Sequence, residues 1–228
     1  MRNILIVIKK QLKDTPKNIT ILIQFILFPG LTLIMENAIN MEGMPELFFT
    51  KLFSMMYIGM APLTSTAAII SEEKEKNTLR VLMMANVKPW QYLMGVGICV
   101  WGICLAGAGI IATGLNGNDV PFYLCFMGLG FIISVIAGAC IGIYAKNQMV
   151  CTSLVMPVMM VLSFAPMLAM FNPNIARFSR IFYTQQLKNT LDKMSFSCVS
   201  GKNMGIIVAN ALLFLVLFYL IYKRKGLE

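Results

Sequence analysis

The stretch PFYLCFMGLGFIISVIAGACIGIYA, residues 121–145, decides the fold, because it holds 25 consecutive residues without an Asp, Glu, Lys or Arg. As an α-helix it would be about 37 Å long, which exceeds the roughly 30 Å hydrocarbon core of a bilayer. Inside lipid, only helices and closed barrels satisfy their backbone hydrogen bonds. The stretch therefore predicts a transmembrane helix.

Five further uncharged stretches approach or exceed the length needed to cross a bilayer. A β-barrel strand would alternate apolar and polar residues over about ten positions, whereas these runs are continuously apolar. We therefore expect an all-α polytopic membrane protein whose residues 1–228 form a single transmembrane domain. The expected spans are residues 18–35, 52–70, 91–115, 121–145, 148–171 and 203–222.

Basic residues are distributed unevenly between the two sides of this expected bundle. If the N-terminus is cytoplasmic, thirteen of the 19 Lys and Arg residues lie inside, whereas the ten acidic residues divide evenly. Such a bias is the positive-inside rule, so we expect both termini in the cytoplasm and the chain in the plasma or inner membrane. The net charge of +9 then reflects contact with anionic lipid rather than with nucleic acid.

Residues 1–17 precede the first span and combine basic with apolar side chains. Ile4, Leu5, Ile8 and Leu12 share one helical face, and the lysines lie off it. This pattern is typical of an interfacial helix whose apolar side enters the membrane surface. A disordered basic leader is the alternative.

Small residues recur every fourth position in the fourth span, at Gly130, Ser134, Gly138 and Gly142. Such a ladder lets a second helix approach closely. It predicts either tight packing within the chain or a contact between subunits.

Residues 172–202, between the last two spans, carry an apolar stripe with basic residues between its members. Tyr183, Leu187 and Leu191 belong to this stripe. We expect an external amphipathic segment that rests on the outer leaflet.

The segment SEEKEKNTLRVLMMANVKPW, residues 71–90, gathers charged side chains between the second and third spans. Ser71 is a favourable N-cap, and the acidic residues after it suit the positive end of a helix dipole. We therefore expect a short cytoplasmic helix over residues 71–89.

An apolar stripe formed by Leu79, Leu82 and Met83 follows the acidic turn of this segment. A helix that is acidic at its start and apolar at its middle is suited to a groove on another protein. The alternative is a solvated loop helix whose leucines rest on the bilayer.

The sequence EEKEKNTLRVLMMANVKPWQYLMG, residues 72–95, resembles the motif that precedes the third span in permeases of the ABC-2 type. Asn77 replaces the usual Gly and tolerates a left-handed backbone better than most residues. Asn86 stands where Pro is common. NPNIARFSRIFYTQQLKNTL, residues 172–191, and the six-span layout extend the resemblance over nearly the whole chain. The residues on the family pattern are Glu75, Thr78, Leu79, Leu82 and Val87.

This resemblance implies that residues 71–89 are a coupling helix received by an ABC ATPase subunit. It also implies two ATPase copies and a second permease subunit, as a homodimer or a paired sister permease. The chain has no GxxxxGK[ST] phosphate loop, so ATP and Mg²⁺ are expected in the partner. The expected coupling residues are Glu72, Glu73, Glu75, Thr78, Leu79, Leu82 and Met83.

The implied function is an ATP-driven exporter of an amphipathic or hydrophobic cargo, such as a drug, an antimicrobial peptide or a lipid. A secondary transporter or a membrane-embedded enzyme is the alternative, although the spans hold no ionisable Asp, Glu, Lys or Arg. The chain has no His and no CxxC pair, so we expect no metal site and no catalytic residue.

Hydroxyl and amide side chains within the spans are candidates to line a substrate path. In lipid such side chains also bond the backbone one turn back, which is the alternative role. The candidates are Gln24, Thr32, Thr64, Ser65, Thr66, Thr152, Ser153 and Asn210.

Overall fold

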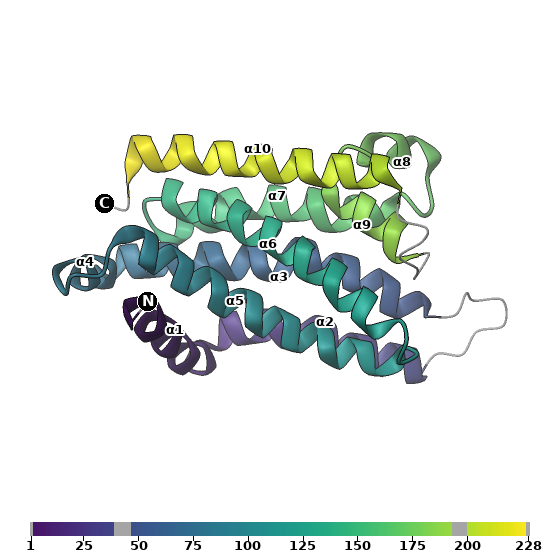
Figure 1. Ribbon diagram of the computed structural model, residues 1–228, viewed down its shortest axis with the longest axis horizontal. Coiled ribbons are helices and arrows are strands. Elements are labelled where there is room, and N and C mark those ends of the chain that lie inside the picture. The colour runs from purple at the N-terminus through teal and green to yellow at the C-terminus, as the bar shows by residue number, and fades with distance from the viewer. Residues whose placement is uncertain (1, 39–46, 193–199, 227–228) are drawn as a thin grey trace.

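The computed structural model describes residues 2–38, 47–192 and 200–226, and these form helices joined by short connections (Figure 1). Six of the helices are long and apolar enough to cross a membrane, so the expected all-α polytopic membrane fold is confirmed. The membrane-spanning helices are α2 (Ile19–Ala38), α3 (Phe48–Glu75), α5 (Pro89–Ile111), α6 (Val120–Tyr144), α7 (Gln148–Leu168) and α10 (Gly201–Lys225). The shorter helices are α1 (Arg2–Asp14), α4 (Thr78–Met84), α8 (Pro173–Ser179) and α9 (Tyr183–Leu191), with single 3₁₀ turns at Thr15–Lys17 and Ala112–Gly114.

Helix α3 is the centre of the bundle, and it packs against α2, α5, α6, α7 and α9. Figure 1 shows α10 along one edge of the bundle, with α2 and α5 on the opposite side of α3 and α6. The start of α1, helix α4 and the end of α10 lie at one end of the bundle, which we call the α4 end. Helices α8 and α9 lie at the other end, which we call the α9 end.

Hydrogen bonds between polar side chains cross the interior of the bundle. The Ser54 hydroxyl of α3 lies 2.6 Å from the Tyr123 hydroxyl of α6. Ser134 of α6 donates to the Ile58 carbonyl of α3 at 2.5 Å, and its oxygen lies 2.6 Å from the Tyr183 hydroxyl of α9. Because a buried polar group without a partner is costly, these pairs specify which helix faces meet.

The small-residue ladder of α6 packs within the chain, against α3. A Cβ added at Gly138 would lie 2.4 Å from the Leu63 carbonyl oxygen, and one at Gly142 would lie 2.9 Å from Ile70 Cβ. These distances leave no room for a side chain, so the backbones meet here because the residues are small. Of the two roles expected for the ladder, the structure supports packing within the chain.

The external segment differs from the expected single amphipathic helix on the outer leaflet. It forms two helices, α8 and α9, and α9 is buried against α3, α6, α7 and α10. Tyr183, Leu187 and Leu191 do share one face, but that face contacts the protein interior and is at most 1% exposed. The expected position was wrong because a stripe alone does not distinguish lipid from protein as its apolar neighbour. Residues 193–199 of this segment lie outside the described residues.

Helix α1 has the two faces expected of an interfacial helix. Val7 is fully buried, and a Cβ added at Gly95 of α5 would lie 2.7 Å from it, so one face of α1 packs closely on α5. Leu5 and Leu12 are more than half exposed, on the face that the apolar stripe predicted for the membrane. The structure thus supports a helix here rather than a disordered leader.

Candidate functional site

The charged segment lies at the α4 end, where α3 extends beyond the length of a membrane span. With 28 residues, α3 is about 42 Å long, so its last turns project beyond a hydrocarbon core of about 30 Å. Ser71 lies inside α3, and its hydroxyl donates to the Ala68 carbonyl at 3.1 Å instead of capping a new helix. The expected single helix over residues 71–89 is therefore corrected: α3 continues to Glu75, since the acidic turn consists of helix-forming residues.

Two asparagines with left-handed backbone delimit α4. Asn77 has φ 56° and separates α3 from α4, and Asn86 has φ 67° and follows the end of α4. The expectation that Asn77 can take the left-handed conformation of the usual Gly is confirmed. Lys88 is extended before Pro89, as a residue preceding proline prefers, and α5 then begins. Helix α4 is thus a seven-residue unit set at an angle between two spans.

Glu73 connects the end of α3 to α1. Glu73 is 7% exposed, and its carboxylate accepts hydrogen bonds from the Lys10 ammonium and, at 2.6 Å, from the Gln11 amide of α1. The fully buried Tyr92 of α5 lies beside the same carboxylate. A carboxylate this buried requires such partners, so α1, α3 and α5 are held together at the α4 end.

The other two glutamates of the acidic turn contact different elements. Glu72 accepts from the Asn18 amide at the start of α2, at 2.8 Å, and pairs with Lys76 one turn later at 2.5 Å. Glu75 accepts from the backbone N–H of Gln148, the first residue of α7, at 2.8 Å. Sequence reasoning assigned these glutamates to an external partner, whereas in the structure all three connect elements of the chain itself.

Helix α4 has one buried face and one exposed face. Leu79 is 2% exposed, and Leu82 and Met83 are partly buried against the core. Val81 and Met84 are on the opposite face and are 64% and 79% exposed. The predicted apolar stripe thus packs α4 on its own bundle, and the exposed surface of α4 is formed by other residues.

Sequence reasoning missed this exposed face, which consists of Arg80, Val81 and Met84. Its signal was present, because Val81 and Met84 are apolar residues three positions apart and so share a side of the helix. The contact with a partner was instead assigned to the more regular stripe at Leu79 and Leu82. Thr78, also expected to couple, is partly buried and donates to the Glu73 carbonyl at 3.2 Å.

Three of the candidate path residues join α2 to α3. Thr64 and Ser65 both donate to the Gln24 side-chain oxygen, at 2.8 and 2.9 Å. These residues therefore have a packing role in the described chain.

The remaining candidates do not form a common cluster with them. Thr32, Thr152 and Ser153 each donate to the carbonyl four residues earlier, and only the last two are exposed. Asn210 donates to the Ile181 carbonyl at 2.8 Å near the α9 end, and Thr66 is 1% exposed in α3. The structure favours the alternative role for most of the set, namely bonding within the protein.

Comparison with known proteins identifies the family. The sequence model of the family described as ABC-2 family transporter protein matches residues 10–222, which is nearly the whole chain. A search of curated proteins finds no match. The family match takes in α2 to α9, the end of α1 and all but the last three residues of α10, so the resemblance seen in residues 72–95 is confirmed. The chain belongs to the ABC-2 family of transporter proteins.

Proposed function

We propose that this chain is the membrane subunit of an ATP-driven exporter, and that the exposed face of α4 receives a separate ATPase subunit. Its family makes the chain an ABC transporter permease subunit and implies association with an ABC ATPase. The observation that carries the docking proposal is the exposed face of α4, where Arg80, Val81 and Met84 project from a helix whose other face is buried. An exposed basic and apolar patch on a rigid element suits a protein partner.

Connections at the α4 end explain how a displacement of α4 would reach the spans. Only Lys76 and Asn77 separate α4 from α3, and the end of α3 is bonded to α1, α2 and α7 through Glu73, Glu72 and Glu75. A displacement of α4 would therefore move several helices together. ATP binding in the partner would shift the equilibrium between two arrangements of the bundle, provided that the α4 contacts differ between them.

The orientation follows from charge and from the position of α4. The positive-inside bias favours a cytoplasmic position for the α4 end. We therefore propose that the chain lies in the plasma or inner membrane. Two ATPase copies would then bind two permease subunits, and ATP and Mg²⁺ would be held by the ATPase. One six-span subunit supplies half of a pathway, so we propose a homodimer or a pair of sister permeases.

The cargo we propose is amphipathic or hydrophobic, such as a drug, an antimicrobial peptide or a lipid. Exposed side chains on α7 support this proposal, because Thr152 and Ser153 lie near Met156 and Met160 on its outward side. Hydroxyls beside flexible methionines offer both polar contacts and an adaptable apolar surface. Of the candidate path residues, these two need no rearrangement of the bundle to meet a cargo.

Aspartate substitution on the exposed face of α4 tests the docking proposal. Val81→Asp/Met84→Asp should abolish co-purification of the ATPase while leaving the thermal stability of the permease near that of the wild type. Val81→Ala/Met84→Ala is the matched control and should retain most of the bound ATPase, because it keeps the surface uncharged. Unchanged ATPase binding by the aspartate variant would contradict docking at this face.

A further inference from the structure

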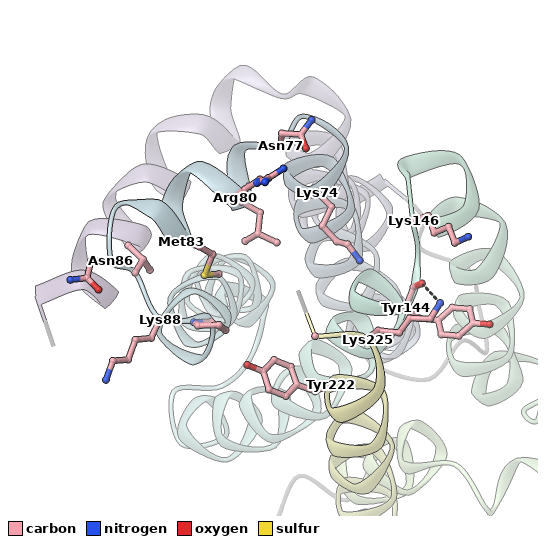
Figure 2. Close-up of a pocket in the computed structure, with 14 residues that line it drawn as sticks. Lys74, Asn77, Arg80, Met83, Asn86, Lys88, Tyr144, Lys146, Tyr222 and Lys225 are labelled. Atoms are coloured by element: carbon pink, nitrogen blue, oxygen red, sulfur yellow. Dashed lines mark hydrogen bonds between the residues drawn. The ribbon is translucent and has the colours of Figure 1, made fainter. Parts of the chain in front are cut away.

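A cleft of about 1230 Å³ opens at the α4 end, on the inner side of α4 (Figure 2). Its walls come from the end of α3, from α4 and the link to α5, from the turn between α6 and α7, and from the last turn of α10. The volume exceeds the range of about 300–1,000 Å³ that is usual for sites of small ligands. The cleft is therefore large enough for part of a lipid.

The charge of this cleft is entirely positive among the described residues that line it. They include five basic residues and no Asp or Glu. None of these five forms an ion pair with any residue that the structure describes. Because no carboxylate that the structure describes pairs with them, an anion entering the cleft is attracted. The five are Lys74, Arg80, Lys88, Lys146 and Lys225.

Two of the ammonium groups converge on the last turn of α6. Lys74 Nζ donates to the Ile143 and Ala145 carbonyls at 2.8 and 3.0 Å. Lys225 Nζ donates to the Tyr144 carbonyl at 3.3 Å and lies 3.9 Å from the centroid of the Tyr144 ring, a pair that Figure 2 also shows. An ammonium has three N–H donors, so one on Lys74 and two on Lys225 remain for a ligand. Two like charges held at one helix end favour an anion that contacts both.

The position of the cleft matches the headgroup layer of a membrane. Tyr144 and Tyr222, which line it, are at the ends of the α6 and α10 spans, where aromatic residues commonly meet the interface. Leu79, Met83 and Val87, from α4 and the link to α5, supply apolar groups to the same cleft. A ligand here meets basic and apolar groups together, which suits the phosphate and the first acyl carbons of a phospholipid.

We propose that this cleft binds the phosphate of an anionic phospholipid from the leaflet at the α4 end. Basic pockets between membrane spans on the cytoplasmic side are suited to anionic headgroups. An acidic surface of the ATPase is less suited, because Val81 and Met84, the apolar exposed side chains of α4, are on its other face and Arg80 alone of the three docking residues borders both surfaces. The lipid site does not depend on export or on ATP coupling.

Titration of the purified full-length chain in detergent tests the site, with bound lipid counted by native mass spectrometry. The wild type should prefer phosphatidylglycerol to phosphatidylcholine, and millimolar inorganic phosphate should not displace the lipid. Lys74→Gln/Lys225→Gln should reduce that preference roughly 25-fold, at about fivefold for each charge near an anionic headgroup. Arg177→Gln/Arg180→Gln, which removes two exposed charges at the α9 end, is the matched control and should keep the preference.

A second variant keeps the test valid if loss of the Lys74 hydrogen bonds prevents folding. Lys225→Gln leaves Lys74 on α6 and should reduce the preference about fivefold. Equal binding of the two lipids by the wild type would overturn the proposal, as would displacement of the lipid by inorganic phosphate. Release of the ATPase by these variants with unchanged lipid preference would also overturn it, because the cleft would then be a protein-docking surface.

Discussion

Among the six candidate spans, α3 is the least hydropathic and the most buried, whereas α10 is the most hydropathic and the most exposed. In their most apolar windows, 78% of α3 residues are buried inside the protein and only 6% of α10 residues are. A soluble protein would show the opposite relation, because water drives the most apolar surface inward. In a bilayer, lipid solvates apolar side chains as well as the protein interior does.

The contents of α3 show what holds a membrane bundle together instead. Its buried residues include Ser54, Tyr57 and Ser65, and each of these is hydrogen-bonded to another residue. Its neighbour α6 presents glycines to it. Close packing and interhelical hydrogen bonds, rather than removal of apolar surface from water, therefore position the central helix.

Enlarging a glycine at the α3–α6 contact should break this relation most severely. Gly138→Leu would force a side chain against the Leu63 carbonyl oxygen, which a Cβ alone would approach to 2.4 Å. Overpacking typically lowers the free energy of unfolding by about 1–3 kcal/mol. Here we expect a larger loss, about 4 kcal/mol, because the obstacle is backbone. The measurement is the free energy of unfolding in mixed dodecylmaltoside and SDS micelles. A Cβ added at Gly205 of α10 would have no neighbouring atom within 4 Å. The unfolding free energy of Gly205→Leu should therefore stay within about 0.5 kcal/mol of the wild type.

A cavity in α3 should cost more than the same kind of truncation in α10. Ile58 is fully buried and Leu212 is 57% exposed, so Ile58→Ala leaves a void and Leu212→Ala does not. We expect about 2–4 kcal/mol for the first and under 1 kcal/mol for the second, by the same unfolding measurement. Similar losses for both would mean that α10 is covered by another protein surface.

Removing the buried carboxylate at the α4 end should have an intermediate effect. Glu73→Gln removes the closer of the two ion pairs of the Lys10 ammonium, which keeps the Asp14 carboxylate at 3.8 Å. Because the Lys10 side chain is also 31% exposed, we expect about 1–3 kcal/mol rather than the full cost of a buried pair. Glu75→Gln, at an exposed site, should cost less than half as much. The measurement is the melting temperature of each variant in detergent, which should fall further for Glu73→Gln. A larger fall for Glu75→Gln would contradict the proposal that Glu73 stabilises the contact between α1 and α3.

Deleting one buried hydroxyl should produce the smallest effect. Tyr183→Phe removes the hydrogen bond to Ser134 and should cost about 0.6 kcal/mol, the average for interhelical hydrogen bonds in a membrane protein. Tyr219→Phe on the exposed side of α10 is the control and should be neutral. A loss above 2 kcal/mol would indicate that the hydroxyl network is cooperative.

The spans could be predicted from sequence because each is a long uncharged run. The small-residue ladder of α6 could be predicted because its members recur every fourth position. The location of α9 could not be predicted, since Tyr183, Leu187 and Leu191 would form the same stripe against lipid or protein. The apolar stripe also gives no indication that polar residues of α9 are buried, such as Gln186, whose amide donates to the Arg180 carbonyl.

A short helix between the second and third spans was predicted correctly, but the bounds and contacts predicted for residues 71–89 were wrong. Asn77 indicated the break between α3 and α4, whereas the fate of Glu72, Glu73 and Glu75 depended on α1, α2 and α7. A stripe that can hold a helix on its own protein is indistinguishable, in one sequence, from a stripe that binds a partner. The exposed face of α4 became recognisable only when its buried face was known.

Site-specific photo-crosslinking tests the docking face of α4 most directly. With p-benzoylphenylalanine replacing Met84, ultraviolet light should produce a covalent adduct with the ATPase, identified by mass spectrometry of its peptides. The same residue replacing Val208, exposed on α10, should give no ATPase adduct. An ATPase adduct from position 208 and none from position 84 would show that the ATPase binds elsewhere and that α4 is not its docking site.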